Sequence, residues 1–262
     1  MSLSKDQWPE YHSGVCSVWA GLVTFYFSQR SSDGNSRLQS WKKEGCSQHM
    51  RSDEILQLVR GPNVLDIGCA GHQVHPDRSD WLHGRLRRHF RVTGIDISEH
   101  NIALLRNWGF DNLHVQNAES FELGNKYNTI VAGEVIEHVS NPGRFFAQVR
   151  RHLLPDGRLV LSTPYVFSLM YALYAANHFP KTCENGEHTC WFCLSTITEL
   201  AGREGLEIES WRLVEDYDEN VASRKYRLYW RLVRTIGRLL PERVTKTNLL
   251  VVLKPGGNAH DP

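Results

Sequence analysis

The feature that most constrains the fold of this chain is an alternation of short apolar runs with helical patterns, which begins after residue 52. Most of the runs are followed by turn-forming residues, as is typical of strands buried inside a parallel sheet. Parallel neighbours need crossover connections, which are usually helices. We therefore expect five parallel strands, at residues 63–67, 92–97, 113–116, 129–132 and 158–162.

The segments between and after these runs complete the expected fold. Helical patterns cover residues 80–90, 100–108 and 142–153, the last beginning with Pro142 after Asn141, whereas residues 120–128 are the least clearly helical crossover. The tail predicts a strand at 207–216, a helix at 224–240 and a final strand at 248–254, which can insert antiparallel beside the sixth. The expected fold is α/β: a doubly wound, Rossmann-like sheet of seven strands with the last strand antiparallel.

Composition limits the domain organisation and the partners. The chain has 262 residues, 41% of them hydrophobic, which is enough for one substantial core. The polar stretch at 28–36 is expected to separate a helical or lid segment, residues 1–45, from a domain at 46–262 that carries an insert at 165–195. A formal net charge of +1 gives no reason to expect nucleic acid as a partner.

Two features bear on location. Six cysteines are too few and too unevenly placed for a disulfide framework, so we expect reduced thiols and a cytoplasmic protein. The apolar stretch at 15–28 is shorter than the roughly 20 residues that span a bilayer. It is expected to be a packed amphipathic helix, with a membrane anchor as the alternative.

The most informative motif is VLDIGCAGH at 64–72, a strand that carries Asp66 near its end and then turns through small residues. Small residues allow a cofactor to approach the backbone. Asp96, near the end of the second strand, is placed to accept hydrogen bonds from ribose hydroxyls. A nicotinamide dehydrogenase or a simple tight turn is the alternative, but a carboxylate at position 66 suits a cationic amino-acid group and would repel a pyrophosphate.

These motifs resemble those of class I S-adenosylmethionine-dependent methyltransferases. VLDIGCAGH resembles the first motif and VTGIDIS (92–98) the second, while QNAE (116–119), YNTIVAGE (127–134) and LPDGRLVLSTP (154–164) resemble later ones. The resemblance implies that Asp66 and Gly68 hold the methionine end of S-adenosylmethionine, that Asp96 holds the ribose, and that Asn117 and Ala118 contact the adenine. Residues counted with these as cofactor-binding are Cys69, Ala70, Ile97, Glu119 and Gly133. The chain departs from the family pattern at Ala70, His72 and Asn117.

The stretch EVIEH at 134–138 directs attention to the acceptor side of the methyl group. On one helical face, Glu134, Glu137 and His138 would bring two carboxylates and an imidazole together, with Glu134 and His138 as candidate catalytic groups. The stretch resembles the Glu-x-x-Glu-His metal motif of small-RNA 2′-O-methyltransferases and ubiquinone-pathway O-methyltransferases. That resemblance implies a magnesium, manganese or zinc ion, with His188 as a fourth ligand. The alternative is packing or simple acid/base chemistry without a metal.

Cysteines offer a second metal hypothesis. Cys183, Cys190 and Cys193 lie close to His188, and Cys190 and Cys193 have the spacing of a zinc knuckle. No second close pair accompanies them, so ordinary buried thiols are the preferred interpretation.

Aromatic residues mark the expected place of the acceptor. The insert at 165–180 carries Phe167, Tyr171 and Tyr174 at helical spacing, which predicts either a core helix or a lid over an acceptor with an apolar part. His178 would then be a candidate base at the edge of this lid. The basic amphipathic helix at 224–240 is expected to cover the sheet, with peripheral contact to anionic lipid as the alternative.

Together these features predict an S-adenosylmethionine-dependent methyltransferase that methylates an oxygen of a small metabolite, a glycan or a lipid-linked acceptor. Two alternatives remain at this stage: a metal-dependent RNA 2′-O-methyltransferase, and a catalytically silent cofactor-binding scaffold.

Overall fold

A computed structural model describes residues 51–71, 75, 81–178, 185–215, 235 and 240–257, with the backbone alone at 177 and 178. The described residues belong to one unit of the chain, Gly45–Pro262. The expected N-terminal segment at 1–45 lies outside them, as do His72, Cys183 and nearly all of the expected helix at 224–240.

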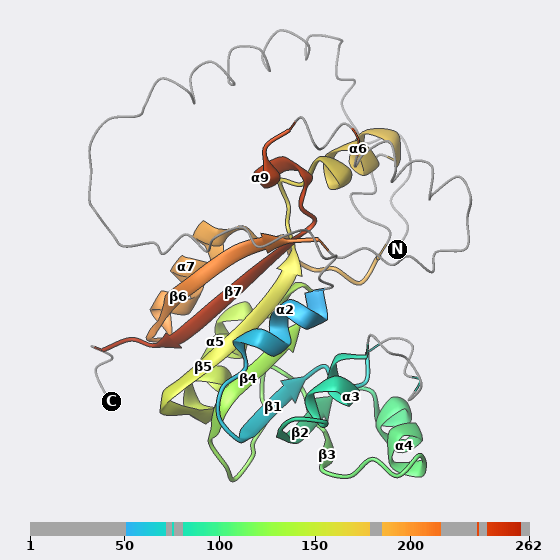
Figure 1. Ribbon diagram of the computed structural model, residues 1–262, viewed down its shortest axis with the longest axis vertical. Coiled ribbons are helices and arrows are strands. Elements are labelled where there is room, and N and C mark those ends of the chain that lie inside the picture. The colour runs from blue at the N-terminus through green and yellow to red at the C-terminus, as the bar shows by residue number, and fades with distance from the viewer. Residues whose placement is uncertain are drawn as a thin grey trace, which may run out of the picture. The chain divides into compact units, whose positions relative to one another are not determined.

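The centre of the fold is one seven-stranded sheet with the order β3-β2-β1-β4-β5-β7-β6. Neighbouring strands from β3 to β5 run parallel, whereas β7 lies antiparallel between β5 and β6, so the expected antiparallel last strand is confirmed (Figure 1). The strands are β1 (Asn63–Ile67), β2 (Arg91–Asp96), β3 (Leu113–Val115), β4 (Tyr127–Gly133), β5 (Leu153–Pro164), β6 (Leu206–Val214) and β7 (Asn248–Pro255).

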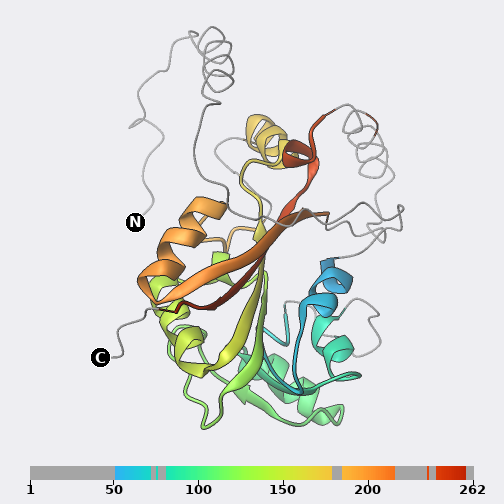
Figure 2. The ribbon, with the colours of Figure 1, turned by 60° about the vertical axis from the view of Figure 1, so that its left-hand side comes forward.

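Helices cover both faces of the sheet because successive residues of each strand point to opposite sides. Helices α5 and α7 lie on one face of the sheet and α2 and α3 on the other (Figure 2). Leu65 and Ile67 pack in one cluster with α5 and α7, whereas Val64 packs with α2 and α3. The described helices are α2 (Arg51–Leu58), α3 (Leu82–Leu86), α4 (Glu99–Asn107), η2 (Ile136–His138), α5 (Pro142–His152), α6 (Leu169–His178), α7 (Leu194–Arg203) and α9 (Glu242–Thr245).

Helix α5 shows why these segments begin where they do. The side chain of Asn141 accepts a hydrogen bond from the Arg144 amide at 3.1 Å, and Pro142 occupies the first turn, where its missing amide hydrogen costs nothing. Phe145, Phe146 and Val149 then point into the core. The expected start of this helix is confirmed.

Three expected elements differ from the structure. Helix α3 spans only Leu82–Leu86, shorter than the expected 80–90, although residues 76–80 lie outside the described part. Residues 120–126 form no helix, and Phe121 is instead buried against the ring of His152, with ring centroids 4.4 Å apart. Phe167 lies before α6 rather than on it and is 63% exposed. No helix in the described part of the chain is long and apolar enough to cross a membrane.

Candidate active site

The carboxyl ends of the parallel strands β1, β2 and β4 meet at one edge of the sheet, where doubly wound folds bind their ligands. The loop after β1 is shaped by Gly68, which has a φ of +78°. A Cβ at this position would also lie 2.6 Å from Cγ2 of Val135, so both the conformation and the space require glycine. The same contact places the loop after β1, which is the expected cofactor loop, directly beside the EVIEH segment.

The rest of this loop presents backbone rather than side chains. The amides of Gly68 and Cys69 both donate to the carbonyl of Ile95, at 2.8 and 3.1 Å. The side chains of Cys69 and Ala70 are buried in a cluster with α4. Burial raises the pKa of the Cys69 thiol, and the carboxylates of Asp66 and Asp96 raise this pKa further. Cys69 is therefore a protonated packing residue, and this part of the loop can offer a ligand only its main chain.

Asp96 connects the loop after β1 to the loop after β2. Its Oδ2 accepts from the Ala70 amide at 3.0 Å and its Oδ1 from the Ser98 amide at 2.9 Å. Each carboxylate oxygen keeps a further lone pair, so ribose hydroxyls could still donate to it. Ile97 follows with 72% of its surface exposed, a placement that leaves an apolar side chain for a flat ligand ring.

The expected adenine motif forms a tight turn next to these residues. The Gln116 amide donates to the Asp96 carbonyl at 3.0 Å, which brings this segment to the same edge. The side-chain oxygen of Asn117 accepts from the Glu119 amide at 2.8 Å, and Glu119 in turn accepts from the Ser140 amide at 2.7 Å. Ala118 packs against the core. Glu119 therefore bonds to the segment after η2.

Asp66, near the end of β1, is buried inside the fold. The residue as a whole is 2% exposed, and its Oδ2 lies 2.9 Å from Nδ1 of His83 on α3. Burial raises the pKa of Asp66, and the hydrogen bond with His83 partly opposes that rise. Sequence reasoning missed His83, because no local pattern links it to a residue 17 positions earlier.

The EVIEH segment differs from the expected helical face. Only Ile136–His138 is helical, as the 3₁₀ turn η2, and Glu134 precedes it with a φ of +57°. The Glu134 carboxylate accepts a hydrogen bond from the side-chain amide of Asn248 and lies 3.7 Å from the Arg51 guanidinium. Glu134 therefore does not share a helical face with Glu137 and His138. The expectation failed because a left-handed residue ends the strand before any regular α-helical spacing can begin.

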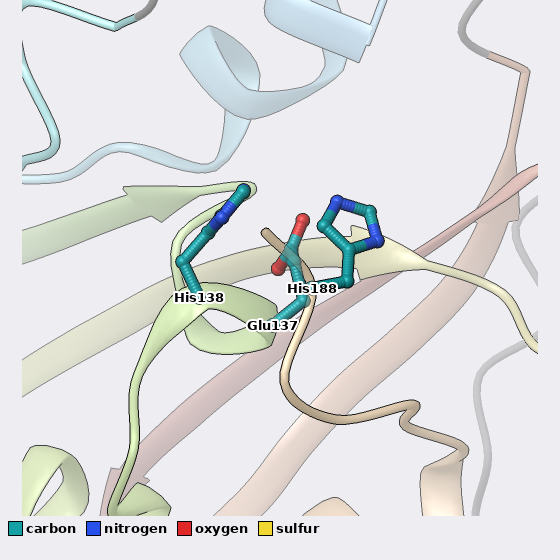
Figure 3. A group of neighbouring side chains, drawn as sticks. All are labelled: Glu137, His138 and His188. Carbon is teal, nitrogen blue, oxygen red and sulfur yellow. The ribbon is translucent and has the colours of Figure 1, made fainter. Parts of the chain in front are cut away.

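Three of the four expected metal ligands nevertheless converge. One ligand atom from each of Glu137, His138 and His188 lies within 4.8 Å of the others, and Glu134 is not part of this group (Figure 3). The imidazole rings of His138 and His188 meet edge to face, with centroids 4.8 Å apart. Residues 137 and 138 come from η2, whereas His188 comes from the segment that follows the insert.

Hydrogen bonds clamp the His188 segment onto η2. The carbonyl of Glu137 accepts from the Thr189 amide at 2.7 Å and from the Thr189 hydroxyl at 3.0 Å. That hydroxyl also lies within hydrogen-bond distance of the Val139 carbonyl, at 2.6 Å. The position of His188 thus depends on hydrogen bonds from the amide and hydroxyl of Thr189 to main-chain carbonyls, which sequence patterns do not reveal.

The Glu137 carboxylate is buried, and only one of its two oxygens accepts a hydrogen bond from a described residue. The Thr163 hydroxyl donates to its Oε2 at 3.0 Å, while its Oε1 is buried without a hydrogen-bond partner among the described residues. Burial, and then the nearby charge of Glu134, raise the pKa of Glu137 to about 8. A buried carboxylate of this kind is typical of a site that holds either a proton or a cation.

Aromatic side chains extend from His188 toward the insert. The ring centroid of Trp191 lies 6.0 Å from that of His188 and 4.9 Å from that of Tyr171 on α6. The structure thus brings one of the expected acceptor-side tyrosines near the three-residue group. The side chain of His178 lies outside the described residues.

The zinc-knuckle hypothesis can be examined in part. Cys190 and Cys193 are free thiols, and among the described residues neither belongs to a group that could hold a metal. Hydrogen bonds from Ser195 and Thr196 lower the pKa of Cys193 despite its partial burial.

Comparison with known proteins adds independent findings. Residues 38–211 match the model of a family described as "Methyltransferase domain". Among curated proteins, the chain is 24% identical over 205 residues to a ubiquinone biosynthesis O-methyltransferase of Rickettsia canadensis (strain McKiel), covering 69% of this chain and 83% of that protein. It is 28% identical over 217 residues to the protein of the same name from Nitrobacter winogradskyi, covering 70% and 76%.

Solved structures share the fold. An S-adenosylmethionine-dependent methyltransferase from Mesorhizobium loti superposes with a TM-score of 0.53 at 18% identity, covering 76% of this chain and 95% of that one. One from Clostridium acetobutylicum gives a TM-score of 0.52 at 14% identity, covering 79% and 91%. At these identities the likeness concerns the fold alone.

Proposed function

The chain belongs to the methyltransferase domain family and is a class I S-adenosylmethionine-dependent methyltransferase; from this premise we propose that it methylates an oxygen atom of a small acceptor with an aromatic or apolar part. The convergence of Glu137, His138 and His188 beside the cofactor loop carries this proposal. The names of the relatives support it, since they are O-methyltransferases.

In this proposal the edge of β1, β2 and β3 holds the cofactor. Asp96 accepts from the ribose hydroxyls, Ile97 packs on the adenine, and Asn117 with Ala118 borders its edge. The methionine end would then lie at the loop around Gly68, which borders the segment that begins at Val135. This contact supports the assignment, because the transferable methyl group would then lie next to the residues that would receive the acceptor.

The sulfonium already activates the methyl group, so the protein needs chiefly to align the acceptor and exclude water. A hydroxyl acceptor must also lose its proton. In the absence of an ion, His138 is the proposed general base, because it lies on η2 shortly after Val135, which borders the loop at Gly68, and its ring meets that of His188. Tyr171 and Trp191 border this group and favour an acceptor with a ring or an apolar portion.

The second part of the proposal is a divalent ion bound at this site. The donor set fits one: two imidazoles and a carboxylate suit zinc or manganese, and the orphaned Oε1 of Glu137 offers an acceptor that nothing else in the described structure satisfies. Glu137, His138 and His188 would hold the ion. When bound, it would polarise the acceptor oxygen and lower the pKa of its hydroxyl.

The test is methyl transfer from S-adenosylmethionine to a panel of phenols, catechols and aliphatic alcohols. The rate is measured as formation of S-adenosylhomocysteine, and the product is identified by mass spectrometry. We expect an O-methyl product with ring-bearing acceptors. Transfer to nitrogen or carbon, with none to oxygen, would contradict the proposal.

The metal is tested separately by measuring the metal content of purified protein and by assaying activity after chelation. Metal bound by the wild type and lost in Glu137→Gln, together with activity restored by added zinc or manganese, would support the ion. Unchanged activity after complete chelation would leave His138 alone as the base.

A further inference from the structure

A buried acid–imidazole pair lies beneath the cofactor loop. Asp66, near the end of β1, and His83, on α3, approach to 2.9 Å, with side-chain exposures of 3% and 0%. Asp66 shares its face of the sheet with Val64, which packs among apolar side chains from α2 and α3. A polar pair therefore occupies an otherwise apolar position, and buried pairs of this kind often add no stability over well-packed apolar residues.

The sheet makes room for this pair. Gly94 of β2 lies opposite Asp66 in the strand register. A Cβ at Gly94 would come within 2.8 Å of both Cε1 of His83 and Sγ of Cys69. The imidazole thus fits only because position 94 lacks a side chain, and it lies next to the first residues of the cofactor loop. Trp81 covers the same place, donating its indole N–H to the Cys69 carbonyl at 2.8 Å.

One polar atom of the pair, the buried Nε2 of His83, has no hydrogen-bond partner among the described residues. If Nδ1–H of His83 donates to an ionised Asp66, the pair carries one negative charge. Uptake of one proton, on either residue, makes the pair neutral. The two states therefore differ by a full charge directly under the loop.

The other ionisable groups on the described elements around the pair are accounted for as follows. Asp96 at the end of β2 is the second carboxylate near Asp66, and the Cys69 thiol is protonated because its pKa is raised. The other ionic side chains of α2 and α3 pair elsewhere: Arg85 with Asp53, Glu54 with Arg212, and Arg51 with Glu134. His83 is therefore the described ionisable group in direct contact with the Asp66 carboxylate, at 2.9 Å.

We propose that His83 is a positioning residue that sets the charge of Asp66, so that affinity for the cationic methionine end of the cofactor falls as the pair takes up a proton. The inference rests on the proposed function, because it assumes that the methionine end lies over the loop at Gly68. The methionine end of the cofactor carries an ammonium and a sulfonium against one carboxylate, so its net charge is positive, and a buried negative charge beneath the loop attracts it across a poorly screened interior.

The experiment measures the dissociation constant of S-adenosylmethionine by calorimetry from pH 5 to 9 for the wild type, His83→Asn and His83→Leu. Asparagine can place its amide nitrogen where Nδ1 lies but cannot take up a proton. Below the pH at which the pair is half protonated, we expect the affinity of the wild type for S-adenosylmethionine to fall by up to about tenfold per pH unit. His83→Asn should match the wild type at alkaline pH and bind more tightly than the wild type at acid pH, whereas His83→Leu should bind more weakly throughout.

The matched control is His152→Asn. His152 is also buried, but its Nδ1 bonds to the Gln148 carbonyl at 2.8 Å, far along the chain from the cofactor loop. Its replacement should lower the melting temperature without moving the pH profile of binding. A pH profile of His83→Asn that superimposes on the wild type would overturn the inference and leave the proposed function intact.

A second measurement needs no variant. Calorimetry of the wild type in buffers of different ionisation enthalpy should show release of close to one proton on cofactor binding below the midpoint and none above it. No proton release at any pH would overturn the inference even if the His83 variants fail to fold. No saturable binding of the cofactor by the wild type would overturn the inference and the proposed function together.

Discussion

At the scale of single residues, steric fit determines the residue type at some positions of the site, and a buried charge determines it at others. Gly68 is of the first kind, because both its φ and its contact with Val135 exclude a side chain. Glu137 is of the second kind, because its carboxylate is buried with one oxygen unsatisfied among the described residues. Each kind of position makes a separate prediction.

Gly68→Ala should weaken cofactor binding by at least tenfold and destabilise the fold by about 1–3 kcal/mol, since it adds both backbone strain and a clash. Gly71→Ala is the matched control: its φ is +58°, but a Cβ there would meet nothing within 4 Å, so it should show only the strain. Urea unfolding and calorimetry measure both effects. Adding Val135→Ala to Gly68→Ala should restore part of the loss; equal losses in both glycine variants would refute the steric argument.

Glu137→Gln should change the pH dependence of stability in the presence of chelator. The folded pKa of about 8 exceeds the ordinary value of 4.5, so the native state holds a proton more tightly than the unfolded chain. The stability that this contributes is complete below about pH 4.5 and is lost as pH rises to about 8. The variant mimics the protonated form and should therefore be more stable than the wild type at pH 9, by at most about 5 kcal/mol at roughly 1.4 kcal/mol per pKa unit. Urea unfolding at pH 5, 7 and 9 tests this, and a constant difference across that range would contradict it.

At the scale of elements, the acceptor side depends on how the segment around His188 is attached to η2. That attachment consists of hydrogen bonds from Thr189 to the carbonyls of Glu137 and Val139. Side-chain clamps of this kind hold a functional residue without placing it on a helix or strand of its own.

Thr189→Val keeps the shape but removes the hydroxyl, so it should cost about 1–2 kcal/mol and lower the turnover number more than the affinity for the cofactor. Thr198→Val is the control. Among the described residues its exposed hydroxyl bonds only to the Leu194 carbonyl of its own helix, at 2.8 Å, and its loss should cost less than about 0.5 kcal/mol. Steady-state kinetics with thermal melting compares the two. Equal effects would mean that the clamp does not position His188.

At the scale of the whole domain, the two faces of the sheet depend on the same strands. Val160 and Leu161 are neighbours in β5, fully buried, and belong to the clusters on opposite faces. Leu161→Ala should cost about 2–5 kcal/mol and Val160→Ala somewhat less, each with a single cooperative transition. Ile97→Ala, at an exposed position, should leave stability nearly unchanged while weakening cofactor binding. Near- and far-ultraviolet circular dichroism followed together would reveal separate transitions if the two faces unfolded independently.

The amino-acid sequence by itself determined the sheet and the edge at which we propose that the cofactor binds. Apolar alternation predicted all seven strands, and the small residues after β1, together with Asp96, predicted where the strand ends meet, because period and turn chemistry are local properties. Residue spacing also singled out Glu137 and His138.

Only the tertiary structure decided which side chains meet across the chain. It paired Asp66 with His83, turned Glu134 toward Asn248 and Arg51, and brought His188 to Glu137. These contacts depend on one left-handed residue, on a glycine that leaves room for a ring, and on hydrogen bonds between segments some 50 residues apart. Such long-range contacts leave no periodic pattern, since their partners are selected by the packing of the finished fold rather than by neighbours in the sequence.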